Sequence, residues 1–99
     1  MAKKFILAHD LGTTGNKATI YDPEGNLLAS SYDEYPTNYF GHNCVEQNPM
    51  DWWNAVCTST KGVITAAQIE PEEIACISFS GHMMGCVAVD KDVLPLRPA

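Results

Sequence analysis

A short polar turn between two apolar runs, near the N-terminus, limits the folds open to this chain more than any other feature. The runs are Phe5–Ala8 and Ala18–Tyr21, and the residues between them read His-Asp-Leu-Gly-Thr-Thr-Gly-Asn-Lys. A Rossmann or P-loop fold would begin a helix directly after the glycines, and neither of their glycine motifs is present. The pattern therefore predicts two strands joined by a tight turn, the first of them a central strand covered on both faces.

The turn carries the groups that a phosphate would need. Asp10 ends the first strand, two glycines let the backbone approach a ligand, and Thr13 and Thr14 add hydroxyl groups beside main-chain N–H groups. Lys17 follows within reach. An ordinary hairpin explains the same residues, because its glycines would supply positive φ and threonines suit strand ends. Both interpretations stay open at this point.

Composition narrows the class of protein. The chain has 99 residues, enough for one small domain, and its 45% hydrophobic and 18% charged residues are ordinary for a soluble globular protein. The net charge is −6 and the few basic residues are scattered, which argues against nucleic acid as a partner. A bound phosphate would therefore depend on local N–H groups, on Lys17 or on a divalent cation.

No apolar run has the length of a secretory signal or a membrane span, so we expect a protein that does not bind membranes. The four cysteines form no C-x-x-C pair, and we expect reduced thiols in a cytoplasmic protein. His42 and Cys44 could form half of a metal site, but a loop histidine beside a small apolar cysteine is the preferred interpretation.

Further strands are predicted after the turn. Lys17–Tyr21 is followed by a turn signal over residues 22–26 and then by a strand over Leu27–Tyr32, which gives an antiparallel meander of three strands. Residues 33–48 show no sustained period, and we interpret them as an irregular surface connection.

A helix follows, with Asn48 as its N-cap and Pro49 at its first position, and it should run to about Ala67. Apolar side chains at helical spacing predict a stripe that packs on the sheet. We assign the two tryptophans to packing rather than to a ligand platform. The stripe comprises Trp52, Trp53, Val56, Thr60, Val63, Ile64 and Ala67.

The last predicted strand leads into a second unusual turn. Ile69–Glu73 is a short polar connection with one helical turn, and Ile74–Ser80 is rich in strand-forming residues. A right-handed crossover through the helix would place this strand parallel to the first. Its carboxyl end, where Gly81–Gly85 turns, would then lie beside the Asp10 turn, at the edge of the sheet where ligands gather.

Four segments resemble a known group of enzymes. Asp10–Thr14 resembles the first phosphate motif of the actin-like ATPase superfamily, which includes sugar kinases, actin and heat-shock chaperones. Val45–Trp53, the Ile74–Ser80 strand, and Gly81–Gly85 leading to Asp90 resemble the FGGY carbohydrate kinases, in the family's order and spacing. The resemblance covers essentially the whole chain. It implies an α/β, ribonuclease H-like portion of the N-terminal domain, with a three-strand meander and a helix crossover to a parallel strand.

Within that family, the segment from Ser80 to Asp90 is most similar to xylulokinases, whose turn usually reads Gly-Gln-Met-His-Gly. This chain has His82 where glutamine is usual and Met84 where histidine is usual, so an expected polar sugar contact is missing at position 84. Glycerol kinases carry an Arg-Glu pair in this region. Its absence here disfavours glycerol as the substrate.

The resemblance implies transfer of a phosphoryl group from ATP to a hydroxyl of a small sugar or polyol, a reaction that depends on positioning and charge neutralisation. In that reaction, Asp10 would hold Mg²⁺ through water. The backbone and hydroxyl groups of Gly12, Thr13 and Thr14 would cradle the β- and γ-phosphates, and Lys17 would add a cation.

On the sugar side, the resemblance implies that His82 and Met83 line the pocket. In relatives the catalytic aspartate and the adenine site come from later segments, so residues 1–99 would be part of an N-terminal kinase domain without its base. We expect such a piece to be inactive alone, and to associate with itself as a homodimer or to fold poorly.

Two other functions stay open. A non-enzymatic, nucleotide-responsive domain of the actin or chaperone kind would share the first turn and use it to switch conformation. A structural interaction module would have a hairpin that binds nothing.

Overall fold

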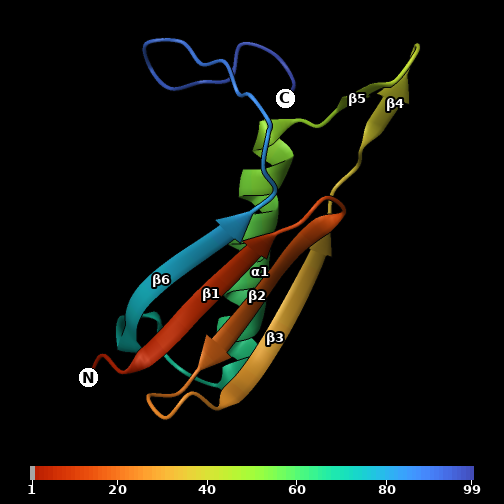
Figure 1. Cartoon of the computed structure of the whole chain (residues 1–99). Helices are drawn as coiled ribbons and strands as arrows, with labels where there is room; N and C mark the ends of the chain where they lie inside the picture. The colour runs from red at the N-terminus through yellow and green to blue at the C-terminus, as the bar shows by residue number, and fades with distance from the viewer. Residues whose placement is uncertain (1) are drawn as a thin grey trace.

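A mixed sheet backed by a long helix makes up most of the chain in the computed structural model, which describes residues 2–99 (Figure 1). Two short strands form a separate hairpin beyond the end of the sheet. The elements are β1 (Phe5–Leu11), β2 (Gly15–Tyr21), β3 (Leu27–Glu34), β4 (Asn38–Phe40), β5 (Cys44–Glu46), α1 (Pro49–Ala67), the 3-10 helix η1 (Pro71–Glu73) and β6 (Ile74–Gly81).

The strand order in the sheet is β3-β2-β1-β6. The first three strands pair antiparallel with their sequence neighbours, whereas β6 pairs with β1 in parallel. The chain between β3 and β6 contains α1, as a connection to a parallel strand requires. The predicted parallel placement of the Ile74–Ser80 strand is confirmed, and it brings Ser80 into register with Asp10.

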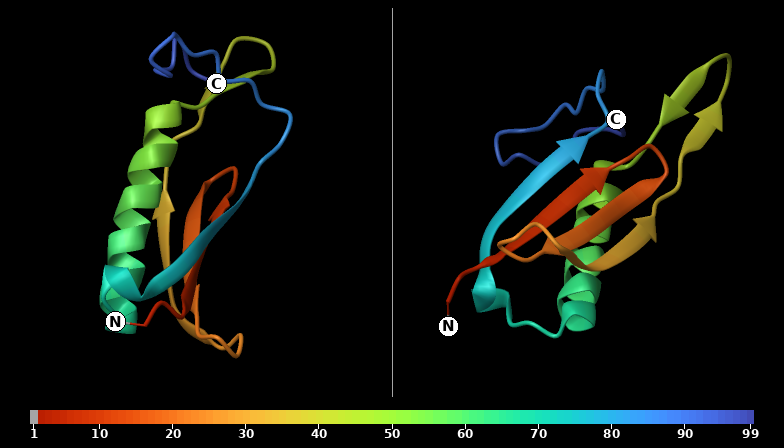
Figure 2. Two further views of the ribbon diagram at one scale, coloured as in Figure 1. Left: turned by 90° about the vertical axis from the view of Figure 1, so that its left-hand side faces the viewer. Right: turned by 60° about the horizontal axis from the view of Figure 1, so that its bottom comes forward.

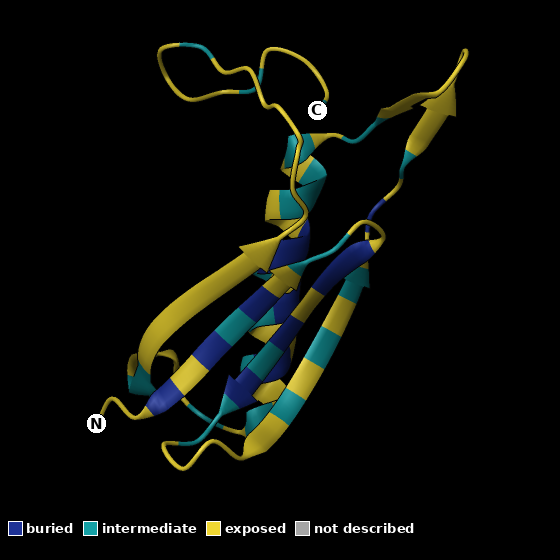
Figure 3. Ribbon diagram, in the orientation of Figure 1, coloured by how far each residue is buried: buried dark blue, intermediate teal, exposed yellow. Residues whose placement is uncertain are grey.

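The core lies between one face of the sheet and α1 (Figure 2). Alternate residues of β1 and β2 are buried, and Leu7, Ile20 and Val63 are fully enclosed. Burial of side chains of this size stabilises the fold by about 1.5–3 kcal/mol each. By contrast, β6 is exposed along almost its whole length (Figure 3). The expectation that the first strand is covered on both faces is not met within residues 2–99, because β1 is buried mainly on the side of the helix.

Helix α1 begins and ends where the sequence predicts. The side chain of Asn48 accepts a hydrogen bond from the backbone N–H of Met50 at 3.0 Å, and Pro49 occupies the first turn. At the other end Gln68 adopts a left-handed conformation, and its N–H closes the helix by donating to Ile64 and Thr65 carbonyls.

The buried stripe of α1 differs from the predicted one. Ala55 and Ser59 are buried together with Val56 and Val63, whereas Trp53 is 58% exposed. Small side chains at the centre of the stripe let the helix lie close to β2 and β3, and the bulky indole is rotated away to solvent. The predicted stripe contains Val56 and Val63 but omits Ala55 and Ser59, whose small side chains give little hydrophobic signal.

The segment over residues 33–48 is also more regular than predicted. β3 continues to Glu34, and β4 pairs with β5 in a hairpin that projects past the sheet (Figure 2). Gly41 and Asn43 supply the positive φ angles that reverse the chain in this hairpin. Three residues per strand are too few to show the alternation that identifies a strand from sequence.

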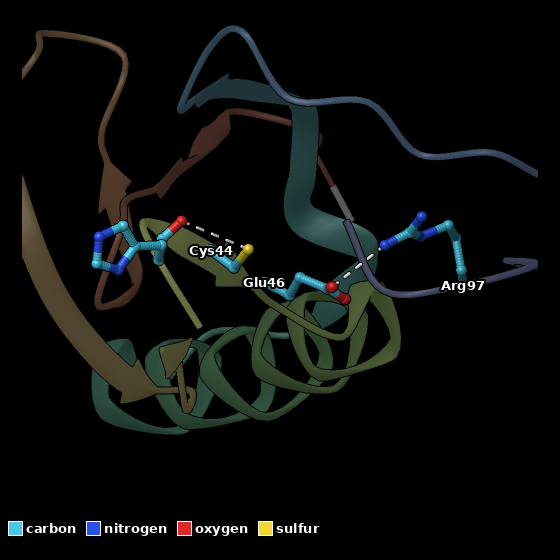
Figure 4. A network of polar contacts seen from close by, with 4 residues as sticks. Cys44, Glu46 and Arg97 are labelled. Atoms are coloured by element: carbon cyan, nitrogen blue, oxygen red, sulfur yellow. Dashed lines mark hydrogen bonds and ion pairs between the residues drawn. The ribbon is translucent and has the colours of Figure 1, made fainter. Parts of the chain in front are cut away.

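The last residues of the chain return to this hairpin. The backbone of Ala99 pairs with that of Gln47, and Arg97 forms an ion pair with Glu46 at 3.1 Å (Figure 4). The Arg97 side chain is 68% exposed, so the ion pair itself stabilises the contact only slightly. Within residues 2–99, no helix is long and apolar enough to cross a membrane.

Candidate functional site

The two unusual turns meet at one edge of the sheet, as predicted from the parallel strands. The first turn follows β1 and the second follows β6. The backbone N–H of His82 donates to the carbonyl of Leu11 at 2.9 Å, which joins the two turns directly. Just before them, Ser80 Oγ donates to Asp10 Oδ1 at 3.1 Å.

The first turn is closed tightly across its own ends. The N–H of Gly12 donates to the carbonyl of Gly15 at 2.9 Å. A Cβ atom added at Gly15 would lie 2.5 Å from the Asp33 carbonyl oxygen and 2.7 Å from the ring of Tyr32. Because no side chain fits there, the glycine is needed for packing against β3 whatever the turn binds.

Neighbouring side chains hold the backbone of the first turn. The phenol of Tyr35 donates to the carbonyl of Gly12, and Gln47 Nε2 donates to the carbonyl of Thr13 at 2.7 Å. Burial raises the pKa of Tyr35, and the nearby Tyr32 and Asp10 raise it further, so the phenol keeps its proton and remains a donor.

Asp10 and Lys17 lie on the face of the sheet that α1 leaves open. They are cross-strand partners in the β1–β2 register, so their side chains leave the sheet on the same face. Both are exposed. A carboxylate and an ammonium group beside a backbone turn form an arrangement suited to a phosphate and its counter-cation.

The second turn is fixed at His82 and open after it. His82 Nδ1 donates to the Leu11 carbonyl at 3.0 Å, which leaves Nε2 of the neutral ring as an acceptor. The ring of Trp52 meets this imidazole edge-on at 4.9 Å. Beyond it Met83 is 86% exposed, so this part of the turn has few contacts within the described residues.

A pocket of about 480 Å³ opens between the two turns and the start of α1. Thr13 and Thr14 line it from the first turn, and His82 and Met83 line it from the second. The structure therefore brings four of the predicted site residues to one cavity. The other three, Asp10, Gly12 and Lys17, lie outside its lining.

A buried polar network supports the first turn from the helix side. His9 is 3% exposed, and its Nδ1 accepts from Asn16 Nδ2 at 2.9 Å, so the ring hydrogen is on Nε2, which donates to Thr60 Oγ1 at 3.1 Å. Asn16 Nδ2 also donates to Ser59 Oγ at 2.8 Å. Burial lowers the pKa of His9, so the imidazole is neutral at neutral pH.

Sequence reasoning missed three residues of the site. The sequence pattern assigns Gln47 only to a helix start, Tyr35 to an irregular connection, and Trp52 to packing. Trp52 lines the pocket and donates from Nε1 to Gln47 Oε1 at 2.8 Å. A half-buried indole needs a partner for its N–H, and that requirement was the available signal.

The described residues contain no group of three or more His, Cys, Asp or Glu side chains that could hold a metal ion. At the candidate half site, Cys44 Sγ contacts the carbonyl of His42 at 3.9 Å (Figure 4). One carboxylate nevertheless suits Mg²⁺, which keeps several waters and is usually held by one or two carboxylates together with substrate phosphates. Asp10 meets that requirement, because it is exposed and only its Oδ1 accepts a hydrogen bond within residues 2–99.

Comparisons with known proteins find relatives across a range of kinases. The glycerol kinase of Thermococcus kodakarensis is 37% identical over 97 residues, covering 98% of this chain and 20% of that protein. A xyloylose kinase from Brucella ovis superposes with a TM-score of 0.85 at 31% identity, covering 95% of this chain and 20% of that one. A gluconate kinase from Lactobacillus acidophilus gives a TM-score of 0.87 at 28% identity, covering 96% and 19%.

These relatives do not single out the xylulokinases over the glycerol kinases. The prediction from the second turn, that the chain is most similar to xylulokinases, therefore has no support from sequence identity. The chain spans about a fifth of the length of the curated relatives it matches. Residues 5–99 match the model for the N-terminal domain of a single family of carbohydrate kinases. The chain belongs to the FGGY family of carbohydrate kinases.

Proposed function

We propose that this chain is the first part of the N-terminal domain of an ATP-dependent kinase, acting in the cytoplasm, that phosphorylates a hydroxyl of a small sugar or polyol. The observation that carries the proposal is the junction of the two turns, where the His82 N–H donates to the Leu11 carbonyl at 2.9 Å. That junction puts a candidate phosphate site and a candidate sugar site at the same edge of the sheet. A ribonuclease H-like, actin-like ATPase fold accords with the observed strand order and parallel β6.

The phosphate side consists of the first turn and the open face beside it. Gly12, Thr13 and Thr14 would contact the β- and γ-phosphates through backbone N–H and hydroxyl groups. Asp10 would hold Mg²⁺ through water, and Lys17 would place a positive charge on the same face. When bound, the ion neutralises charge on the phosphates.

The sugar side consists of the second turn and the pocket. Nε2 of His82 is left as an acceptor for a substrate hydroxyl, and the ring is held by Leu11 and Trp52. Met83 would cover an apolar part of the substrate. Oriented binding of the hydroxyl next to the phosphate turn would supply the proximity that phosphoryl transfer requires.

The test is coupled ADP release by the full-length protein that carries this chain, with Mg-ATP and a panel that includes glycerol, xylulose and gluconate. We expect one member of the panel to give release well above background. Background release with every sugar and polyol would contradict the proposal. The 99-residue chain alone serves as a control and should show no turnover, because the proposal places the catalytic base elsewhere.

The same assay distinguishes the main alternative, a nucleotide-responsive domain of the actin or chaperone kind. ATP turnover that is independent of any sugar would favour that alternative. The second turn and its contact with the first argue against it, because a nucleotide switch has no need of a second pocket beside its phosphate turn.

A further inference from the structure

Three consecutive carbonyl groups of the first turn are held by donors from Tyr35 and Gln47, which lie on either side of the β4–β5 hairpin. Tyr35 supplies two of the donors: its phenol donates to the Gly12 carbonyl, and its backbone N–H donates to the Thr14 carbonyl at 3.2 Å. Gln47 Nε2 donates to the carbonyl between them, that of Thr13, at 2.7 Å. The backbone of the turn is therefore fixed by groups outside it.

Fixing a carbonyl also fixes the N–H of the next residue. Residues 2–99 contain no cis peptide bond, and in a trans peptide the C=O and the following N–H point in opposite directions. The bond from Tyr35 to Gly12 thus orients the Thr13 N–H, and the bond from Gln47 to Thr13 orients the Thr14 N–H. Neither of these N–H groups has a hydrogen-bond acceptor within residues 2–99.

Both N–H groups point away from the donors that hold the carbonyls. Tyr35 is 6% exposed and packs at the helix side of the turn, and Gln47 immediately precedes the cap of α1. The opposite side is the open face of the sheet, where Asp10 and Lys17 lie. Two free N–H groups on the side of a cation make a receptor for an anion, and carbonyl oxygens on that side would repel one.

We infer that Tyr35 and Gln47 are positioning residues for the phosphate groups of the nucleotide, because they hold the carbonyls of the first turn away from the site and so keep the Thr13 and Thr14 N–H groups turned toward it. This inference rests on the proposed function. It assigns both residues a role in nucleotide binding that requires no direct contact between them and the nucleotide.

Gln47 makes a second hydrogen bond, so its contact with the phosphate turn can be tested separately from its contact with the sugar side. Its Oε1 accepts from Trp52 Nε1 at 2.8 Å, and Trp52 contacts His82. In Gln47→Glu the carboxylate can still accept from the indole, but it has no hydrogen to donate to the Thr13 carbonyl. The variant therefore removes the contact with the phosphate turn and keeps the contact with the sugar side.

The experiment measures the Kd of Mg-ADP by calorimetry, with the KM of ATP and the KM of the sugar, in the full-length protein and its variants. Tyr35→Phe and Gln47→Glu should each raise the Kd of Mg-ADP and the KM of ATP by about three- to tenfold, the range expected for one hydrogen bond. The sugar KM should change by less than about twofold in Tyr35→Phe. If the role of Tyr35 were merely structural, the KM of ATP and the KM of the sugar would change together.

Two control variants carry the same chemical changes elsewhere. Tyr21→Phe removes a phenol hydroxyl at the far end of the sheet, and Gln68→Glu adds the same charge at the far end of α1. Both should leave the Kd of Mg-ADP unchanged. Unchanged nucleotide binding in both Tyr35→Phe and Gln47→Glu, with a wild-type protein that binds Mg-ADP, would overturn the inference alone. A wild-type protein that binds no nucleotide would overturn the proposed function, and this inference with it.

Discussion

The two turns at the edge of the sheet are built very differently. In the first, the carbonyls of Gly12, Thr13 and Thr14 are all bonded, and Gly15 is packed without space for a side chain. In the second, Gly81 pairs with Leu11 and His82 is hydrogen-bonded, but among the described residues nothing lies within 4 Å of a Cβ added at Gly85. Contacts within residues 2–99 fix the shape of the first turn, whereas most of the surface of the second turn is uncovered in this part of the chain. On the proposed function, residues of this chain fix the shape of the turn on the phosphate side, whereas the turn on the sugar side has few contacts within residues 2–99.

The largest expected effect comes from removing the charge of Asp10 while keeping the shape of the first turn. Asp10→Asn in the full-length protein should lower kcat by about 10²–10³-fold, because the neutral amide no longer supports the cation that neutralises phosphate charge. The melting temperature should change little, because Asp10 is exposed. Asp92→Asn, an exposed carboxylate in the C-terminal segment, is the matched control. An unchanged kcat in Asp10→Asn would refute the metal-binding role.

A pair of glycine variants tests the contrast in packing. Gly15→Ala should lower the free energy of unfolding by more than about 2 kcal/mol, because the methyl group would overlap the Asp33 carbonyl and the Tyr32 ring. Gly85→Ala should change it by less than about 0.5 kcal/mol, because the second turn leaves open space there. Urea denaturation measures both. Equal losses in the two variants would remove the distinction between the turns.

The smallest expected effect concerns the support beneath the first turn. The folded-state pKa of His9 is lowered from its ordinary value of 6.5 by burial, so the unfolded chain binds the proton more readily. The stability that neutral His9 contributes is present above pH 6.5 and is lost as the pH falls below it toward the folded-state pKa. Protonation would also remove the acceptor that Nδ1 offers to Asn16.

The measurement is the melting temperature between about pH 7.5 and pH 5.5. It should fall with decreasing pH in the wild-type protein and fall less in His9→Asn, whose carboxamide oxygen can accept from Asn16 and does not titrate. An identical pH dependence in the two proteins would show that His9 has no such role.

Much of this architecture could be predicted from local sequence. The Asn48 cap and the limits of α1 depend on a few adjacent residues, and the parallel placement of Ile74–Ser80 follows from the order strand, helix, strand; the structure confirms all three. The contacts made by Tyr35 and Gln47 could not be predicted, because they join residues 23 and 34 positions apart in the chain. Local propensity carries no information on such distant partners.

The packing of Gly15 also bears on how glycine motifs are used to assign function. The Asp33 carbonyl and the Tyr32 ring exclude a side chain at this position with or without a ligand. A descendant that had lost all affinity for nucleotides would therefore still be under selection to keep this glycine. In sequence searches, this glycine indicates the fold, whereas the exposed Asp10 and Lys17, to which we assign the cation and the phosphate, are the better markers of the proposed chemistry.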